Sequence, residues 1–118
     1  MLQNAQMKNI IKLSSKVTVY VPSTTDVNVT IDNTEYVNKT ATLLSECFGG
    51  ATSTNTLGYW VSATEGLVTE KSTMVFSYCT DVQLNEHMEK IVKWVNVMKK
   101  ELSQEAIAIE VNGEMWLV

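Results

Sequence analysis

The 118-residue sequence contains no arginine, so all nine of its basic residues are lysines. Arginine is the side chain best suited to recognising phosphates and base edges through paired hydrogen bonds. The 13 acidic residues give the chain a formal net charge of −4, opposite to that of a typical nucleic-acid-binding domain. These features argue against direct nucleic-acid binding and leave a protein surface as the more plausible partner.

Histidine and cysteine are also scarce, with one histidine, His87, and two cysteines, Cys47 and Cys79. No pair of them has the spacing of a zinc site, and no Ser/His/Asp or Cys/His arrangement is evident. Four glutamates are candidates for a pair of catalytic carboxylates, but no spacing singles them out: Glu35, Glu46, Glu70 and Glu110. We therefore expect no catalytic residues, no cofactor and no metal, and we expect that the chain is not an enzyme.

Long apolar runs are missing as well. No stretch approaches the ~20 apolar residues of a membrane-spanning helix, and residues 1–13 lack the apolar segment of a signal peptide. Two cysteines without an export signal are typical of reduced thiols in the cytosol. We therefore expect a cytoplasmic protein that does not enter a membrane.

The stretch SECFGGATST, residues 45–54, places Cys47 two residues before Gly49 and Gly50. Phosphate-binding loops follow a strand and open a helix, whereas here an apolar helical stripe precedes the glycines. The negative pole at the end of a helix raises a thiol pKa rather than lowering it. We interpret Gly49 as the residue that ends a helix and Cys47 as a core residue rather than a nucleophile.

Alternating or β-rich segments indicate the strands. Residues 16–22 alternate valine with polar residues, residues 51–61 and 67–79 are joined by a short connection that contains Gly66, and residues 106–111 and 114–118 flank Asn112-Gly113. The Asn-Gly pair favours a type I′ turn between two strands.

Two helices are indicated by apolar residues at helical spacing. The first begins near Asp32 and Glu35, which have capping-box spacing, and carries the stripe Val37, Ala41, Leu44 and Phe48. The second begins with another possible capping box, Thr80 and Gln83, and runs to about Ser103. Its stripe is the strongest periodic signal in the chain: Leu84, Met88, Ile91, Val95, Met98 and Leu102.

The element order is β-α-β-β-α-β with one more C-terminal strand. It predicts an α+β fold, a ferredoxin-like split β-α-β sandwich in which two helices cover one face of an antiparallel sheet. We expect a single domain over residues 16–118, preceded by an N-terminal extension over residues 1–15.

The sheet face away from the helices is the predicted contact surface. We expect the helix-covered face to carry Val17, Val19, Val21, Met74, Phe76, Ile107 and Ile109. The other face then receives Tyr20, Trp60 and Trp116, and large aromatic side chains often dominate binding energy. These three residues are the predicted interaction site.

Four segments in order, FGGAT (48–52), GYWVS (58–62), GLVTEKSTMVFSYC (66–79) and QEAIAIEVNGE (104–114), resemble small proteins of phages and other mobile elements of Gram-positive bacteria. A looser similarity is to PII-like sensors, ferredoxin-fold proteins that trimerise and bind nucleotides between subunits. This chain differs from them in its short connection after residue 61 and its lack of arginine.

The resemblance to mobile-element proteins implies an inhibitor or accessory protein that binds a host protein, such as a defence component. From the sequence we therefore expect a non-enzymatic interaction domain whose partner is another protein or a second copy. The alternative is a small-molecule-binding regulatory oligomer with its ligand between subunits.

Overall fold

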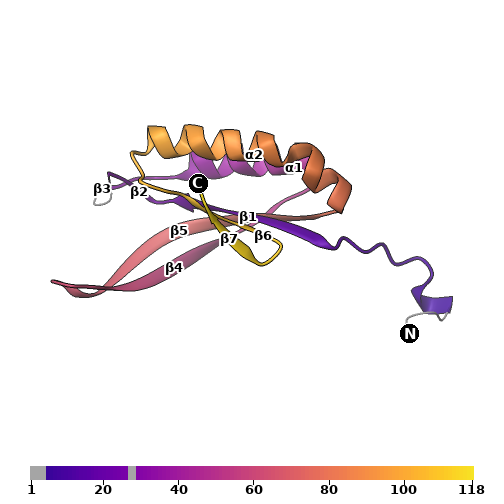
Figure 1. Cartoon of the computed structure of the whole chain (residues 1–118), viewed down its shortest axis with the longest axis horizontal. Coiled ribbons are helices and arrows are strands. Elements are labelled where there is room, and N and C mark those ends of the chain that lie inside the picture. The colour runs from indigo at the N-terminus through magenta and orange to yellow at the C-terminus, as the bar shows by residue number, and fades with distance from the viewer. Residues whose placement is uncertain (1–4, 27–28) are drawn as a thin grey trace.

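The computed structural model describes residues 5–26 and 29–118. Its elements are η1 (Ala5–Met7), β1 (Ser15–Pro22), β2 (Thr24–Thr25), β3 (Val29–Thr30), α1 (Thr34–Phe48), β4 (Thr52–Ser62), β5 (Gly66–Cys79), α2 (Asp81–Glu101), β6 (Ala108–Val111) and β7 (Glu114–Leu117). Five strands form an antiparallel sheet in the order β4-β5-β1-β6-β7, and α1 and α2 lie on one face of it (Figure 1). The predicted α+β, ferredoxin-like fold is confirmed.

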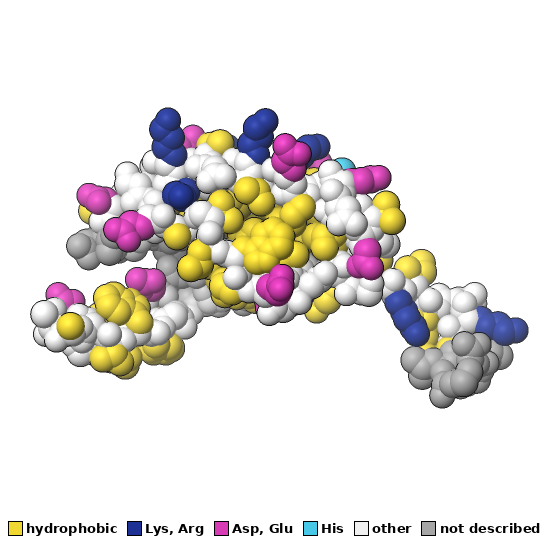
Figure 2. Space-filling view, viewed as in Figure 1, with side chains coloured by type: hydrophobic (Ala, Val, Ile, Leu, Met, Phe, Trp, Pro, Cys, Tyr) yellow, Lys and Arg dark blue, Asp and Glu magenta, His cyan; other side chains and the backbone are white. Residues whose placement is uncertain are grey.

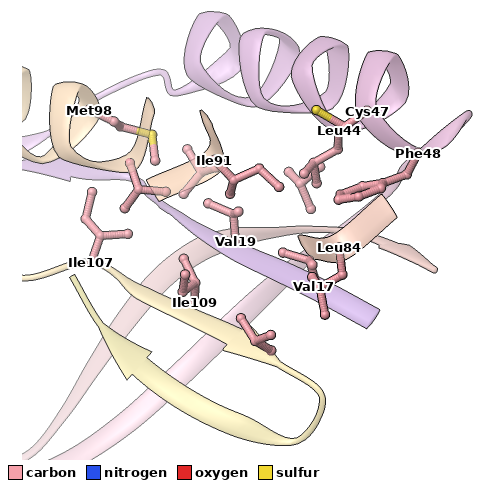
Figure 3. Close-up of a cluster of buried hydrophobic side chains, with 14 of the residues drawn as sticks. Val17, Val19, Leu44, Cys47, Phe48, Leu84, Ile91, Met98, Ile107 and Ile109 are labelled. Carbon is pink, nitrogen blue, oxygen red and sulfur yellow. The ribbon is translucent and has the colours of Figure 1, made fainter. Parts of the chain in front are cut away.

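The hydrophobic core lies between the helices and the central strand. Val17, Val19 and Val21 alternate along β1 and are fully buried beneath the helices. Ile91 and Met98 of α2 and Leu44 of α1 point into the same layer (Figure 3). The period of two in the strand and of three to four in the helices therefore converges on one core.

The ends of the helices follow local sequence signals. Gly49 ends α1 with a φ of +93°, and its N–H donates to the Ser45 carbonyl oxygen at 2.8 Å, which confirms the predicted helix end. Thr80 and Gln83 form the predicted capping box at the start of α2.

The other predicted capping box is wrong. Asn33 is the residue that precedes α1, and its side chain makes no cap hydrogen bond. The Asp32 carboxylate instead accepts the Thr34 N–H at 3.0 Å, so it closes a local turn one step ahead of the helix.

The turn between β6 and β7 is the predicted type I′ turn, with φ of +51° at Asn112 and +84° at Gly113. A two-residue turn fixes the register of the hairpin, so Val111 pairs with Glu114 and Ile109 pairs with Trp116. Residues that pair directly in an antiparallel sheet lie on the same face.

The β4–β5 hairpin is longer than the rest of the sheet. β1 pairs with β5 only between Ser72 and Cys79, so the outer part of the hairpin, residues 57–71, has no third strand beside it. In Figure 1 this part curves away from the body of the domain. A three-residue loop, 63–65, and Gly66 with a φ of +74° close its tip.

The chain ahead of β1 runs away from the sheet in Figure 1. It contains η1 and a stretch of exposed residues, 8–14. Residues 1–4 lie outside the described part of the chain, and the division into an extension over residues 1–15 and a domain over residues 16–118 remains a prediction.

Candidate functional site

The sheet face opposite the helices, called the open face below, carries the side chains that alternate with the buried valines. Register pairs Tyr20 with Met74 and Thr18 with Phe76, and it pairs Gly58 with Glu70 and Thr56 with Ser72 on the same side of the hairpin. Trp60 lies two residues beyond Gly58 and shares this face. The open face therefore combines aromatic, thioether, hydroxyl and carboxylate groups.

Met74 and Phe76 were expected on the helix-covered face, and this expectation is wrong. Their direct partners, Tyr20 and Thr18, point away from the helices. On β5 the odd-numbered residues Val75, Ser77 and Cys79 face the helices and are buried. The helices thus pack against small side chains on β5, and the larger Met74 and Phe76 remain on the open face.

Trp116 was expected on the open face beside Tyr20 and Trp60, and this expectation is also wrong. It pairs with the buried Ile109 and therefore lies on the helix-covered side, at the edge of the sheet. Its side chain is 37% exposed, and its indole N–H donates to Glu114 Oε1 at 3.3 Å. Tyr20 and Trp60 lie on the predicted face, and a role for any of the three in interaction remains a prediction.

A cleft of about 540 Å³ opens where the projecting hairpin leaves the body of the domain. Its walls come from all five strands of the main sheet and from β2 and the chain that follows α2. Figure 2 shows the corresponding hollow between the hairpin and the body. This volume falls within the range of small-molecule sites, and Tyr20, Met74 and Leu117 supply apolar wall.

The hairpin supplies the two charged groups of the cleft and two of its hydroxyl groups. Glu70 is the one carboxylate in its walls and Lys71 the one ammonium group. The Trp60 indole N–H donates to Glu70 Oε1 at 3.1 Å, which orients the carboxylate. Thr56 and Ser72 bring their hydroxyl oxygens within 2.5 Å of each other across the two strands. Such a set can hold a ligand that has both a charged and a flat apolar part.

One wall of the cleft is fixed by Gln104, which follows α2. Its side-chain N–H₂ donates to the Thr24 carbonyl oxygen at 3.0 Å and to the Leu102 carbonyl oxygen at 3.1 Å. These bonds tie the end of α2 to β2, so this side of the cleft is built before any ligand arrives.

A second part of the open face, farther along β1, is closed by packing. The Lys16 ammonium lies 4.7 Å from the centre of the Phe76 ring and 5.4 Å from that of Tyr78. Thr18 is fully buried and donates to Glu110 at 3.4 Å. The room for a ligand on the open face is therefore at the Tyr20–Glu70 end.

Another hollow, of about 720 Å³, follows the outer side of α1 from Asp32 to Glu46. Although it is larger, only α1 and Asp32, two residues before the helix, supply its walls, and Leu43 is the one apolar side chain among them. A ligand there would keep much of its surface in water, so we place the candidate site in the cleft.

The two cysteines and the histidine are packed against neighbouring side chains. Cys47 and Cys79 are buried, and burial raises the pKa of both thiols, which disfavours the nucleophilic thiolate. His87 is half-buried against Phe48, with ring centres 5.9 Å apart at a nearly perpendicular angle. The expectation that Cys47 is a core residue is confirmed.

Within residues 5–26 and 29–118, no group of three or more His, Cys, Asp or Glu side chains is placed to hold a metal ion. None of the helices in that part of the chain is both long enough and apolar enough to cross a membrane.

The solved structures with a similar fold include two of a phage SAM lyase. The structure in complex with S-methyl-5′-thioadenosine matches with a TM-score of 0.64 and 16% sequence identity, over 95% of this chain and 94% of that chain. The apo structure matches with a TM-score of 0.60 and 15% identity, over 92% and 94%. At this identity the match shows a shared fold.

More distant comparisons add no family. A Bacillus cereus protein related to NIF3 matches with a TM-score of 0.43 and 16% identity, over 88% of this chain and 25% of that chain, too weakly to support an argument. No protein-family model matches the sequence, and no curated protein sequence matches it. The phage source of the lyase agrees with the resemblance to phage proteins at the level of the fold.

The expectation that this chain is not an enzyme is contradicted by the comparison. Two structures that share its fold over more than nine-tenths of both chains are those of a lyase. The expected inhibitor role and the expected protein partner remain predictions.

The sequence argument named Tyr20 and Trp60 but did not single out Glu70, and it missed Met74 and Ser72. The signal was present in the hairpin. With a three-residue loop at 63–65, even-numbered residues of β4 pair with even-numbered residues of β5, so Trp60 places Glu70, Ser72 and Met74 on its own face.

Proposed function

We propose that this chain is a small phage-type enzyme that binds S-adenosylmethionine (SAM) in the cleft of the open face and cleaves it. The observation that carries the proposal is the full-length match to a phage SAM lyase, together with a cleft of suitable size and chemistry on this chain.

The walls of the cleft complement the parts of SAM. Tyr20 and Met74 offer flat and polarisable apolar surface for an adenine ring. Glu70 offers a negative charge for the sulfonium or the ammonium group, and Lys71 a positive charge for the carboxylate. The paired hydroxyls of Thr56 and Ser72 are suited to the ribose hydroxyls.

The reaction needs little from the protein beyond binding and orientation. A sulfonium sulfur leaves with the electron pair of its carbon–sulfur bond and becomes the neutral thioether of S-methyl-5′-thioadenosine. The carboxylate oxygen of the same substrate attacks the carbon that leaves sulfur and forms a new carbon–oxygen bond. The product is a four-carbon lactone, and no co-reactant is required. Holding the carboxylate behind that carbon is a problem of positioning, which explains why no Ser/His/Asp arrangement is needed.

The test is incubation of the purified protein with SAM, followed by liquid chromatography and mass spectrometry for S-methyl-5′-thioadenosine and for homoserine or its lactone. Glu70→Gln removes the charge and keeps the shape, so we expect kcat/KM to fall about tenfold or more.

Glu65→Gln is the matched control, because Glu65 is an exposed glutamate in the loop of the same hairpin and lies outside the cleft. It should leave the rate unchanged. Absence of SAM turnover by the folded wild-type protein, or equal rates for the two variants, would contradict the proposal.

A further inference from the structure

The outer part of the β4–β5 hairpin exposes large apolar side chains on both of its faces. Tyr59 is 62% exposed and Val61 77% exposed on one face, and Trp60 is exposed on the other. Leu57 and Leu67 extend the exposed set. In Figure 2, hydrophobic side chains gather on the projecting hairpin. A two-stranded ribbon with apolar residues on both faces has little to stabilise it by itself in water.

β4 is also a free edge of the sheet. It is 11 residues long and pairs with β5 on one side only. Edge strands that must stay single usually carry proline, lysine or other charges, or are very short. β4 has none of these features, since residues 51–64 contain no charged residue and no proline. The other edge, β7, is only four residues long and begins at Glu114.

The distribution of charge indicates which kind of partner could bind the free edge of β4. Two copies of a chain with net charge −4 repel each other over most of their surface. The uncharged run 51–64 is where two such copies can meet without like charges facing each other. A strongly basic partner would gain nothing from this run, because it offers no carboxylate.

We infer that β4 is an interface between copies of this chain, in which the edge of β4 adds to the sheet of a second copy and the outer hairpin buries its apolar side chains against it. Strand addition satisfies the free N–H and C=O groups of β4. This self-association does not require the proposed reaction, and the two are tested by separate measurements.

The test is the solution mass of the protein, measured by sedimentation velocity over a wide range of concentration. The double variant Tyr59→Lys/Val61→Lys places two charges on the outer hairpin, away from the core. The matched control is Val82→Lys/Val97→Lys on α2, which adds the same charge at two exposed valines, 66% and 43% exposed. We expect the wild type and the control to be oligomeric and the hairpin variant to have the mass of one chain.

Hydrogen exchange locates the interface independently. The outward amides of β4 should be protected in the wild type and in the control, and they should exchange rapidly in the hairpin variant. Should the double variant fail to fold, the single Val61→Lys variant carries the same comparison. A monomeric wild type at every concentration, or a hairpin variant that associates as strongly as the wild type, would overturn the inference.

Discussion

Cys47 shows how the environment of one residue decides its chemistry. Its side chain is 6% exposed at the end of α1, and loss of hydration raises the pKa of the thiol, with the nearby Glu46 carboxylate acting in the same direction and Lys90 opposing it. The folded protein therefore favours the protonated thiol, which is a poor nucleophile.

Replacing Cys47 by alanine should lower the free energy of unfolding by roughly 1 kcal/mol, the cost of a small cavity. The measurement is urea denaturation of both proteins. With a disulfide reagent at neutral pH, native Cys47 should react far more slowly than the thiol of the unfolded chain. Labelling of the native protein as fast as that of the unfolded chain would contradict its burial.

The same residue predicts a pH dependence. Because the folded state holds the thiol proton more tightly, the unfolded chain releases it at a lower pH. The contribution of Cys47 to stability is thus complete below the ordinary cysteine pKa of about 8.5 and declines as the pH rises above it. The decline measured for the wild type between neutral and alkaline pH should be smaller in Cys47→Ala.

At the scale of elements, α1 ends because Gly49 adopts a left-handed backbone with φ of +93°. An added Cβ there meets no atom within 4 Å, so any cost of a side chain comes from the backbone conformation. Gly49→Ala should lower the free energy of unfolding by about 1 kcal/mol.

Gly50→Ala is the control for this prediction, because Gly50 is equally open but does not have a positive φ. It should be nearly neutral or slightly stabilising. Equal costs at the two positions, measured by thermal or urea unfolding, would contradict the account of the helix end.

Elements with strong periodic or turn signals could be predicted from the sequence. The α2 stripe from Leu84 to Leu102, the alternation of β1 and the Asn112-Gly113 turn were each sufficient. The face of a strand was harder, because a shift of one residue exchanges its two sides. Met74 and Phe76 are larger and more apolar than Ser77 and Thr73, yet register with β1 places the smaller residues under the helices.

Trp116 illustrates the same difficulty at a turn. Alternation along β7 alone gives two possible faces, and only the pairing of Val111 with Glu114 decides between them. The two-residue type I′ turn implies this pairing, so the register of the hairpin could have been derived by carrying the predicted turn one step further.

At the scale of the whole molecule, the helices and the core support a sheet whose other face is open. The cleft exists because the β4–β5 hairpin extends beyond β1 and curves away from the body (Figure 1). No single segment of the sequence predicts this cleft, because the five strands of the main sheet, β2 and the chain after α2 all contribute to its walls. The sequence therefore indicated two aromatic residues of the open face, Tyr20 and Trp60, but not the cleft in which we propose that a ligand binds.

The expectation of a non-enzymatic protein failed for a related reason. It rested on the lack of nucleophile, acid and base at recognisable spacings, which is a sound criterion for acyl transfer or hydrolysis. A sulfonium compound already contains its leaving group, so a site that cleaves it can rely on shape and a few charges. In the proposed site, Glu70, whose carboxylate accepts the Trp60 indole N–H, would supply one such charge.

The most direct test of this account is to locate where a ligand binds. The measurement is the change in the amide chemical shifts of the protein during titration with S-methyl-5′-thioadenosine. Binding in the cleft predicts saturable shifts at Tyr20, Thr56, Glu70, Ser72 and Met74, with little change along the outer side of α1 between Asp32 and Glu46. No saturable change, or changes confined to α1, would contradict the central claim that the open face is the ligand site.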